Sequence, residues 1–255
     1  MPHSIVGRKP VLEALLAGTA IEKIVLLQGV RGSVITEITA AAERKKIAIA
    51  IADRQEFNAL ATEETAQGVV AVIAERKLLT LEELIAKVKE TNEPGFLLLL
   101  DEIEDPHNMG ALIRTAECAG VHGVVVTKHH SAPINATVVK SSAGATEHMP
   151  VAEVTNLVQS MDELKEQGYW IAGLDMSGDR LYTAMDFTTP IALIVGNEGR
   201  GIRRLVREHC DFVLSIPLYG KIGSLNASVA GGLVLFEAAR RRQEHKGDLK
   251  SQTKP

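Results

Sequence analysis

Cysteine is rare in this sequence. Only Cys118 and Cys210 occur among 255 residues, and neither stands in a CxxC or metal-ligand spacing. A disulfide framework and a zinc site are therefore not expected, and no cluster of carboxylates predicts another metal. We expect both thiols to be buried, free and in a reducing cytoplasm.

Aromatic residues and long apolar runs are also scarce. Phe, Trp and Tyr make up 4% of the chain, although hydrophobic residues make up 45%. An apolar content carried by Ala, Val, Ile and Leu suits helices packed on parallel strands, so we predict an α/β fold. No apolar run approaches the length of a membrane span, and the N-terminus lacks the apolar core of a signal peptide. The sequence thus predicts a soluble cytoplasmic protein without a membrane partner.

An excess of positive charge is absent as well. The formal net charge is −4. The field of the whole molecule does not indicate nucleic acid, although an acidic protein can carry a local basic face. Charge therefore neither supports nor excludes an RNA partner.

The first part of the chain alternates helix and strand patterns. We predict helices at residues 10–17, 34–46 and 54–60, and strands at 24–27, 47–51 and 68–73. A charged helix follows, with Thr80 as N-cap and Glu83 completing a capping box. These patterns predict a small α/β domain at 1–75 and a linker helix at 76–94.

From residue 95 the apolar runs are longer and nearly continuous, which is typical of parallel strands buried on both faces. Strands are predicted at 96–100, 121–126, 170–174, 191–195 and 212–216, and helices at 111–119, 136–143, 157–167, 203–209 and 227–242. We assign a second domain to residues 95–243 and predict that the tail, 244–255, is disordered.

Three segments of the second domain carry polar residues at helix starts. In the first, residues 105–116, Pro106 and Asn108 mark a turn after a strand, and Arg114 lies near the second turn of the helix that follows. An isolated match of this kind is explained by Asn108 as a helix cap and Arg114 as a surface cation.

The second segment, Gly196-Asn-Glu-Gly-Arg-Gly201, directly follows a strand. Its glycines allow a sharp turn and a close approach of backbone to a ligand. The spacing is not GxGxxG, so a Rossmann dinucleotide or methyltransferase site is not indicated. Glu198 either orients a cation or an amine, or acts only on the helix dipole.

The third segment, residues 216–232, runs from a strand through a glycine-rich loop into a small-residue helix. Ser224 and Asn226 bracket the start of that helix, where free amides suit polar ligand groups. A role in capping the helix explains one of these two residues well, but it explains the pair less well. Because ligands of open α/β sheets bind at the carboxyl ends of strands, the second and third segments together predict a small-ligand site. A Ser-His-Asp nucleophile elbow, HExxH and a Walker loop are all lacking.

In this order, the three segments resemble the motifs of the SpoU (TrmH) family of S-adenosylmethionine-dependent RNA 2′-O-ribose methyltransferases. Residues 5–14 and 67–71 look like the substrate-binding domain of the family's ribosomal branch, which is similar to ribosomal protein L30e. The chain is most similar to the RlmB-like members, which methylate a guanosine in 23S ribosomal RNA. The resemblance implies a deep trefoil knot in the second domain, S-adenosyl-L-methionine as cofactor, and a homodimer packed through the knot region whose two subunits complete each site.

The resemblance also implies roles for individual residues. The catalytic group comprises Arg114, Asn108, Glu198, Ser224 and Asn226, and the cofactor-binding group comprises Leu174, Gly196, Gly201, Ile216, Leu218 and Leu225. For RNA contact we expect Arg8, Lys9, Arg114 and Lys140, since phosphates need cations.

The family assigns the catalytic base to the arginine that matches Arg114. Arginine stays protonated, with a pKa above roughly 12. Either the RNA phosphate and neighbours such as Asn108 and Glu198 assist proton loss, or Arg114 orients the ribose and stabilises the developing alkoxide.

Three other functions compete with methylation of 23S ribosomal RNA. Two are enzymes: a tRNA ribose methyltransferase, and a resistance methylase that acts elsewhere on ribosomal RNA. The third is a non-catalytic RNA-binding factor in ribosome assembly, which would bind RNA without affinity for the cofactor.

Overall fold

The computed structural model describes residues 4–16, 19, 21–61, 66–73 and 78–252. The chain forms two compact units, Met1–Lys77 and Leu78–Pro255. The predicted domain boundary at residues 75–76 and the last residue of the first predicted helix, residue 17, lie outside the described residues.

The first unit is a sheet covered by helices on both faces. Its strands are β1 (Ser4–Val6), β2 (Ile21–Leu27), β3 (Ala48–Ala52) and β4 (Val69–Ile73), in the order β1-β4-β2-β3. β4 is antiparallel to β1 and β2, whereas β2 and β3 are parallel.

Successive residues of β2 point to opposite faces, so Ile24 packs with helices α1 (Arg8–Leu16) and α2 (Ser33–Arg44), and Val25 packs with α3 (Arg54–Leu60). The predicted α/β character of this unit is confirmed, but β1 was missed.

The second unit is built on a parallel sheet of seven strands in the order β7-β6-β5-β10-β8-β11-β9. The strands are β5 (Phe96–Asp101), β6 (Gly123–Thr127), β7 (Val151–Val154), β8 (Trp170–Leu174), β9 (Arg180–Leu181), β10 (Ile191–Gly196) and β11 (Phe212–Ser215). Every pairing in this sheet is parallel. The predicted parallel sheet is confirmed; β7 and β9 are additional strands.

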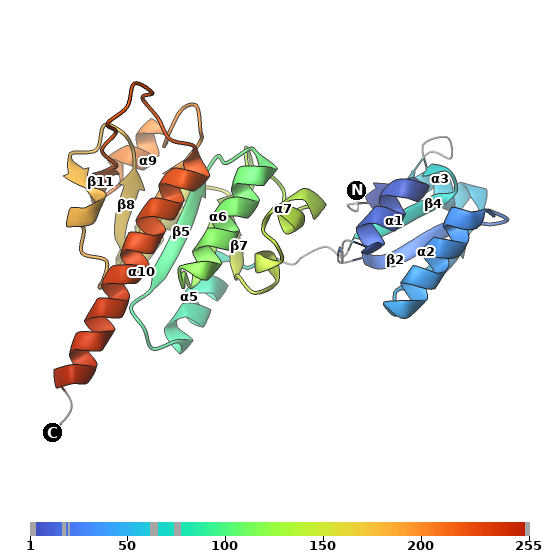
Figure 1. Ribbon diagram of the computed structural model, residues 1–255, viewed down its shortest axis with the longest axis horizontal. Helices are drawn as coiled ribbons and strands as arrows, with labels where there is room; N and C mark the ends of the chain where they lie inside the picture. Colours follow the sequence, from blue (N-terminus) through green and yellow to red (C-terminus); the bar gives the residue numbers. More distant parts are fainter. Residues whose placement is uncertain (1–3, 17–18, 20, 62–65, 74–77, 253–255) are drawn as a thin grey trace. The chain divides into compact units, whose positions relative to one another are not determined.

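Helices cover both faces of this sheet, because the central strands are apolar on both sides. Leu98 and Leu100 pack with α6 (Pro106–Cys118), α7 (Ala136–Ser141) and α10 (Ala227–Gln252). Leu97 and Leu99 pack with α5 (Leu81–Glu90), α8 (Leu157–Glu166) and α9 (Arg204–Glu208). Figure 1 shows α6 and α10 side by side on one face. Short 3-10 helices span Ala145–Glu147 and Tyr182–Ala184.

The structure corrects three expectations about the second unit. The predicted linker helix is α5, which begins with the expected Thr80–Glu83 capping box but packs into this unit through its buried Leu84. The sequence predicts disorder after Gln243, whereas α10 continues to Gln252. Cys118 is exposed rather than buried, and Cys210 is half-buried.

The topology creates a switch point beside β5. The chain passes from β5 to β6 and β7 on one side, and later places β10, β8 and β11 on the other. The carboxyl ends of these last three strands are adjacent, and such a crevice is where open α/β sheets bind ligands. None of the described helices combines the length and the apolar character needed to cross a membrane.

Candidate functional site

A cavity of about 260 Å³ lies at the carboxyl ends of β8, β10 and β11 and reaches the start of α10. This volume is near the lower end of the range for small-molecule sites, roughly 300–1,000 Å³. All the residues predicted to bind the cofactor line this cavity: Leu174, Gly196, Gly201, Ile216, Leu218 and Leu225. Glu198 and Ser224, from the predicted catalytic group, line it as well. Three separate segments of sequence therefore meet at one cavity.

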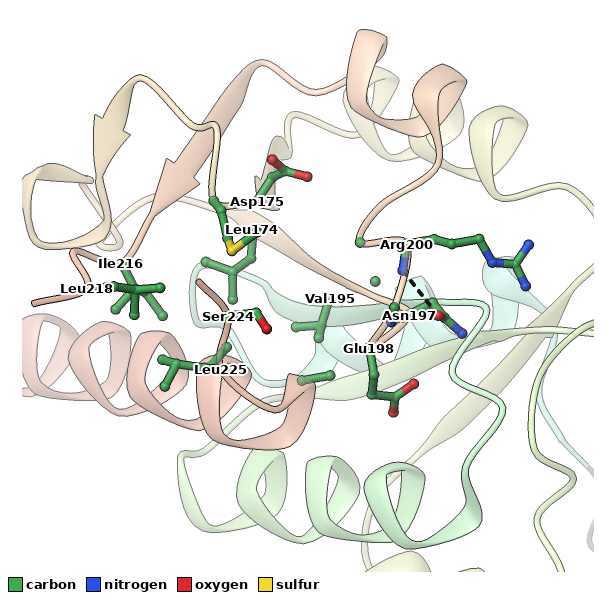
Figure 2. Close-up of a pocket in the computed structure, with 16 residues that line it drawn as sticks. Leu174, Asp175, Val195, Asn197, Glu198, Arg200, Ile216, Leu218, Ser224 and Leu225 are labelled. Carbon is green, nitrogen blue, oxygen red and sulfur yellow. Dashed lines mark hydrogen bonds between the residues drawn. The ribbon is translucent and has the colours of Figure 1, made fainter. Parts of the chain in front are cut away.

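The cavity has an apolar end and a polar end (Figure 2). The side chains of Ile216, Leu218 and Leu225 gather at one end. Glu198 lies toward the other end, and Arg200 points away from the apolar group. Such a division suits a ligand with a flat apolar part and a charged part.

The loop Gly196–Gly201 forms one wall of the cavity and is closed on itself. The Gly201 backbone N–H donates to the Asn197 carbonyl at 2.8 Å, and the Asn197 side-chain oxygen accepts from the N–H groups of Gly199 at 2.9 Å and Arg200 at 3.4 Å. Gly201 has a φ of +67°, a conformation that favours glycine. The three glycines of the loop, Gly196, Gly199 and Gly201, thus expose backbone at the cavity wall between Asn197, Glu198 and Arg200.

A chain of hydrogen bonds joins the three predicted catalytic residues that come from different elements. Glu198 Oε1 accepts from Asn108 Nδ2 at 2.5 Å, and Asn108 Oδ1 accepts from Asn226 Nδ2 at 3.0 Å. Asn226 Oδ1 accepts from the N–H groups of Ser228 at 2.9 Å and Val229 at 3.3 Å, at the start of α10. The Glu198 carboxylate is therefore held by residues of α6 and the start of α10, and Glu198 is one of the residues that line the cavity.

Asn108 does not cap α6 as the sequence predicts. Asp105 is the cap, since its carboxylate accepts from the His107 N–H at 3.0 Å and Pro106 occupies the first turn. Asn108 is one turn further along, which frees its side chain to bridge Glu198 and Asn226.

A second carboxylate, Asp175, also lines the cavity. Burial raises the pKa of its carboxyl, but hydrogen bonds from the Ser177 hydroxyl and backbone N–H, together with the charge of Arg207, outweigh burial and bring the pKa below its ordinary value. Asp175 is therefore ionised at neutral pH. A cavity with Asp175 and Glu198 on its wall favours a ligand that carries positive charge.

Not every predicted residue reaches the cavity. Arg114 is exposed on α6, does not line the cavity, and makes no hydrogen bond or ion pair with any described residue. Lys140 is exposed on α7. In the first unit Lys9 is exposed, whereas the Arg8 side chain donates to the Gln67 carbonyl at 3.0 Å. The roles of these residues stay predictions.

Sequence reasoning missed several residues of the cavity wall. Asp175 and Met176 follow β8, and Val195, Asn197, Gly199, Arg200, Ala227 and Ala230 come from the neighbourhood of β10 and α10. Asp175 could have been found from its position directly after a predicted strand. Clusters of three or more His, Cys, Asp or Glu able to hold a metal do not occur in the described part of the chain.

Two family models match the chain. The model of the SpoU rRNA Methylase family matches residues 95–236, and the model of RNA 2′-O ribose methyltransferase substrate binding matches residues 4–79. Together they cover both structural units.

Individual proteins give the same result. The Bacillus subtilis protein named "Putative TrmH family tRNA/rRNA methyltransferase YacO" is 40% identical over 238 residues, which are 93% of this chain and 95% of that protein. The crystal structure of the SpoU methyltransferase AviRb from Streptomyces viridochromogenes, in complex with AdoMet, is 26% identical with a TM-score of 0.65 and covers 94% of this chain and 90% of that one.

The structure of the A. aeolicus TrmH/SpoU tRNA modifying enzyme is 30% identical with a TM-score of 0.55, and the match covers 66% of this chain and 87% of that one. Motifs, fold and comparisons agree. The chain belongs to the SpoU rRNA methylase family and is an RNA 2′-O-ribose methyltransferase.

Proposed function

We propose that the cavity at the ends of β8, β10 and β11 binds S-adenosylmethionine, and that the protein methylates a guanosine ribose 2′-hydroxyl in 23S ribosomal RNA. The observation that carries the first part is the meeting of all the predicted cofactor residues at one cavity. S-adenosylmethionine is the cofactor of the family, and AviRb, which shares the fold, is described in complex with it.

The residues of the cavity fit this cofactor. Ile216, Leu218 and Leu225 offer apolar surface to an adenine ring, and the closed loop after β10 offers backbone groups at close range. The carboxylates of Asp175 and Glu198 complement positive charge. When bound, the cofactor supplies a methyl group on a sulfonium, which is activated toward attack by oxygen.

The chain's own residues must then position the ribose and manage one proton. A ribose hydroxyl is a weak nucleophile at neutral pH and needs a proton acceptor and in-line alignment. Glu198 is a carboxylate held at the cavity by Asn108, so it is suited to take this proton directly or through water. Arg114 supplies a guanidinium that stabilises the alkoxide or the RNA phosphate rather than acting as a base.

Support for a homodimer comes from α10. Val229, Leu233 and Phe236 lie at intervals of three and four residues on one side of this helix, and their exposed fractions are 51%, 43% and 52%. This apolar stripe lies on the helix whose first residue, Ala227, lines the cavity. Since Arg114 of a single chain does not reach the cavity wall, a second subunit packed on the stripe would complete the site.

Two observations bear on which RNA is the substrate. The first unit matches the substrate-binding model, and such modules choose the RNA while the second unit supplies the chemistry. The relatives' names include both tRNA and rRNA, so a tRNA ribose is the second candidate. We place ribosomal RNA first because the A. aeolicus tRNA modifying enzyme matches only 66% of this chain.

The test uses labelled S-adenosylmethionine with 23S ribosomal RNA from a strain that lacks the gene, and with total tRNA as the competing substrate. We expect a 2′-O-methyl mark on a single guanosine of 23S RNA. Methylation of tRNA alone would replace the ribosomal proposal with the second candidate. Failure of calorimetry to detect cofactor binding would reject the enzyme's proposed site altogether.

Variants assign the roles. Arg114→Ala should lower kcat on the order of 10²–10³-fold, as loss of a charge-stabilising donor does, with the cofactor Kd unchanged within about twofold. Arg204→Ala, which removes an exposed arginine on α9, is the control and should keep full activity. Wild-type turnover in Arg114→Ala would remove Arg114 from the mechanism.

A further inference from the structure

A fully buried carboxylate lies behind the cavity and does not touch it. Asp101 is the last residue of β5 and its side chain is 0% exposed. Its hydrogen-bond and ion-pair partners in the described part of the chain all belong to Arg203: the backbone N–H donates to Oδ2 at 2.8 Å, Nε donates to Oδ1 at 2.7 Å, and Nη2 is 2.7 Å from Oδ1. One aspartate thus fixes both the backbone and the side chain of one arginine.

The next residue along the chain fixes the same loop from its other side. The Glu102 carbonyl accepts from Asn197 Nδ2 at 3.1 Å, and the Glu102 carboxylate lies 3.3 Å from Arg203 Nη1. Asn197 and Arg203 flank the cavity loop, Gly196–Gly201, at its beginning and just past its end. Asp101 and Glu102 therefore hold both ends of this loop to the neighbouring strand, and we name Asp101, Glu102, Asn197 and Arg203 the loop clamp.

Three features show that the clamp serves position more than stability. The Asp101–Arg203 pair is a weak source of folding free energy, because desolvation of the fully buried Asp101 carboxylate offsets its attraction to the half-exposed Arg203. Glu102 adopts a φ of +57°, which is unfavourable for glutamate and is held by these contacts. Every residue of the loop, Gly196, Asn197, Glu198, Gly199, Arg200 and Gly201, contributes to the cavity wall.

We propose that Asp101 and Arg203 are positioning residues for cofactor binding: through the loop clamp they set the shape of the Gly196–Gly201 wall and the location of Glu198. This inference rests on the proposed cofactor site. It adds residues outside the three sequence motifs, because neither Asp101 nor Arg203 lines the cavity. Substitutions of Asp101 or Arg203 should therefore change the affinity for the cofactor, although neither residue lines the cavity.

The experiment compares Arg203→Met, which removes the charge, with Arg203→Lys, which keeps it. Kd for S-adenosylmethionine is measured by calorimetry, and amide exchange of residues 196–201 is measured without cofactor. We expect Arg203→Met to raise Kd at least tenfold and to speed exchange in the loop, and Arg203→Lys to recover part of both. Arg204→Met, the neighbouring exposed arginine, should match the wild type.

A general loss of stability is separated from a loss of position by Leu164→Ala. Leu164 of α8 is buried in the hydrophobic core that also contains Ile202, the residue before Arg203. It is not part of the loop clamp. At a temperature where both variants are folded, Leu164→Ala should bind the cofactor as the wild type does despite a lowered Tm.

The inference is overturned if Arg203→Met keeps the wild-type Kd, or if Leu164→Ala loses as much affinity as Arg203→Met. Absence of binding by the wild type would instead overturn the proposed site, so the two failures are distinguishable. Should Arg203→Met fail to fold, the same comparison is made with Arg203→Lys and Asp101→Asn, and wild-type affinity in both variants would reject the clamp.

Discussion

Single atoms decide the shape of the cavity wall. At Gly196 an added Cβ would lie 2.3 Å from the Gly201 carbonyl carbon and 2.4 Å from the Ile202 nitrogen. At Gly199, in the same loop, the nearest atom to an added Cβ is Asn197 Oδ1 at 3.6 Å, an ordinary contact. Two glycines that look equivalent in the sequence are therefore unequal in the structure.

This inequality gives a matched pair of variants. Gly196→Ala should push the loop out of place and weaken cofactor binding at least tenfold, which corresponds to about 1.4 kcal/mol. Gly199→Ala should bind within twofold of the wild type, since its Cβ makes only an ordinary contact with Asn197 Oδ1. Calorimetric titration of both variants with S-adenosylmethionine is the measurement, and equal affinities would show that the close approach of backbone at Gly196 has no bearing on the ligand.

At this scale the sequence predicted which residues meet, but not how. The motif residues Gly196, Ile216 and Leu225 line one cavity as predicted, because they follow strands whose carboxyl ends are adjacent. The partner of Asn108 could not be predicted, since its 2.5 Å contact with Glu198 depends on the register between α6 and the loop. Burial of Cys118 was predicted wrongly, because apolar composition does not say which helix face a residue occupies.

Helix α10 connects the cavity to the opposite end of the sheet. It begins at Ala227, which lines the cavity, and later places Arg242 beside the start of β5. There the Arg242 guanidinium donates to the carbonyls of Pro94 at 2.6 Å, Gly95 at 3.0 Å and Thr189 at 2.8 Å, and lies 4.7 Å from the centre of the Phe96 ring. The helix is thus anchored at both of these points.

The basic run Arg240–Arg242 has the composition of a nucleic-acid patch, yet its charges are used within the chain. Arg240 pairs with Glu237 and Glu244, and Arg241 pairs with Glu237. Burial lowers the pKa of Arg242 to about 10, so its guanidinium is still protonated at pH 7. Contacts within the chain therefore account for the basic residues of this segment without RNA binding.

We predict that Arg242→Met destabilises the second unit on the order of 2–3 kcal/mol, because three backbone carbonyls lose their donor and two of these contacts, with Gly95 and Thr189, are partly buried. Arg240→Met should leave the free energy of unfolding nearly unchanged, because exposed ion pairs contribute little to it. Urea unfolding of the two variants measures the difference. Equal midpoints would mean that the carbonyl contacts at the end of α10 carry no net stability.

At the scale of elements, sequence patterns found the long elements and missed the short ones. The strand 170–174 and the helix 54–60 have the predicted bounds, since each has continuous periodicity and clear ends. β9 consists of Arg180–Leu181 and depends on pairing with β11, which no local pattern shows. The capping box of α5 was read correctly, but a cap does not tell whether a helix links units or packs on one of them.

The whole molecule divides its tasks between two units, each with its own hydrophobic core. The first matches a substrate-binding model and the second a methylase model. Sequence patterns predicted two domains, whereas the tasks of the two domains and the trefoil knot were implied by the family resemblance, and the knot stays a prediction. The proposed homodimer belongs to the same scale, and its support is the exposed apolar stripe Val229, Leu233 and Phe236 on α10.

We predict that Leu233→Asp converts a homodimer into a monomer. Leu233 is 43% exposed in one chain, so the aspartate is tolerated there, whereas burial of an unpaired carboxylate in an apolar interface costs several kcal/mol. Leu205→Asp, at a residue 53% exposed on α9, is the control and should leave the mass unchanged. Sedimentation equilibrium distinguishes the two, and a wild-type monomer would refute the interface.

Loss of the dimer should also stop catalysis if Arg114 acts on the neighbouring subunit's cavity. Gly196→Ala damages the cavity wall of its chain, and Arg114→Ala removes the cation of the other chain. In a mixed dimer the intact cavity and the intact Arg114 therefore lie on different chains. They form a complete site only if Arg114 acts on the cavity of the neighbouring subunit. Mixing the two inactive variants should then restore up to about a quarter of wild-type turnover, because roughly half the dimers are mixed and each has one working site. If Arg114 instead serves the cavity of its own chain, the mixed dimer has no complete site and activity stays absent.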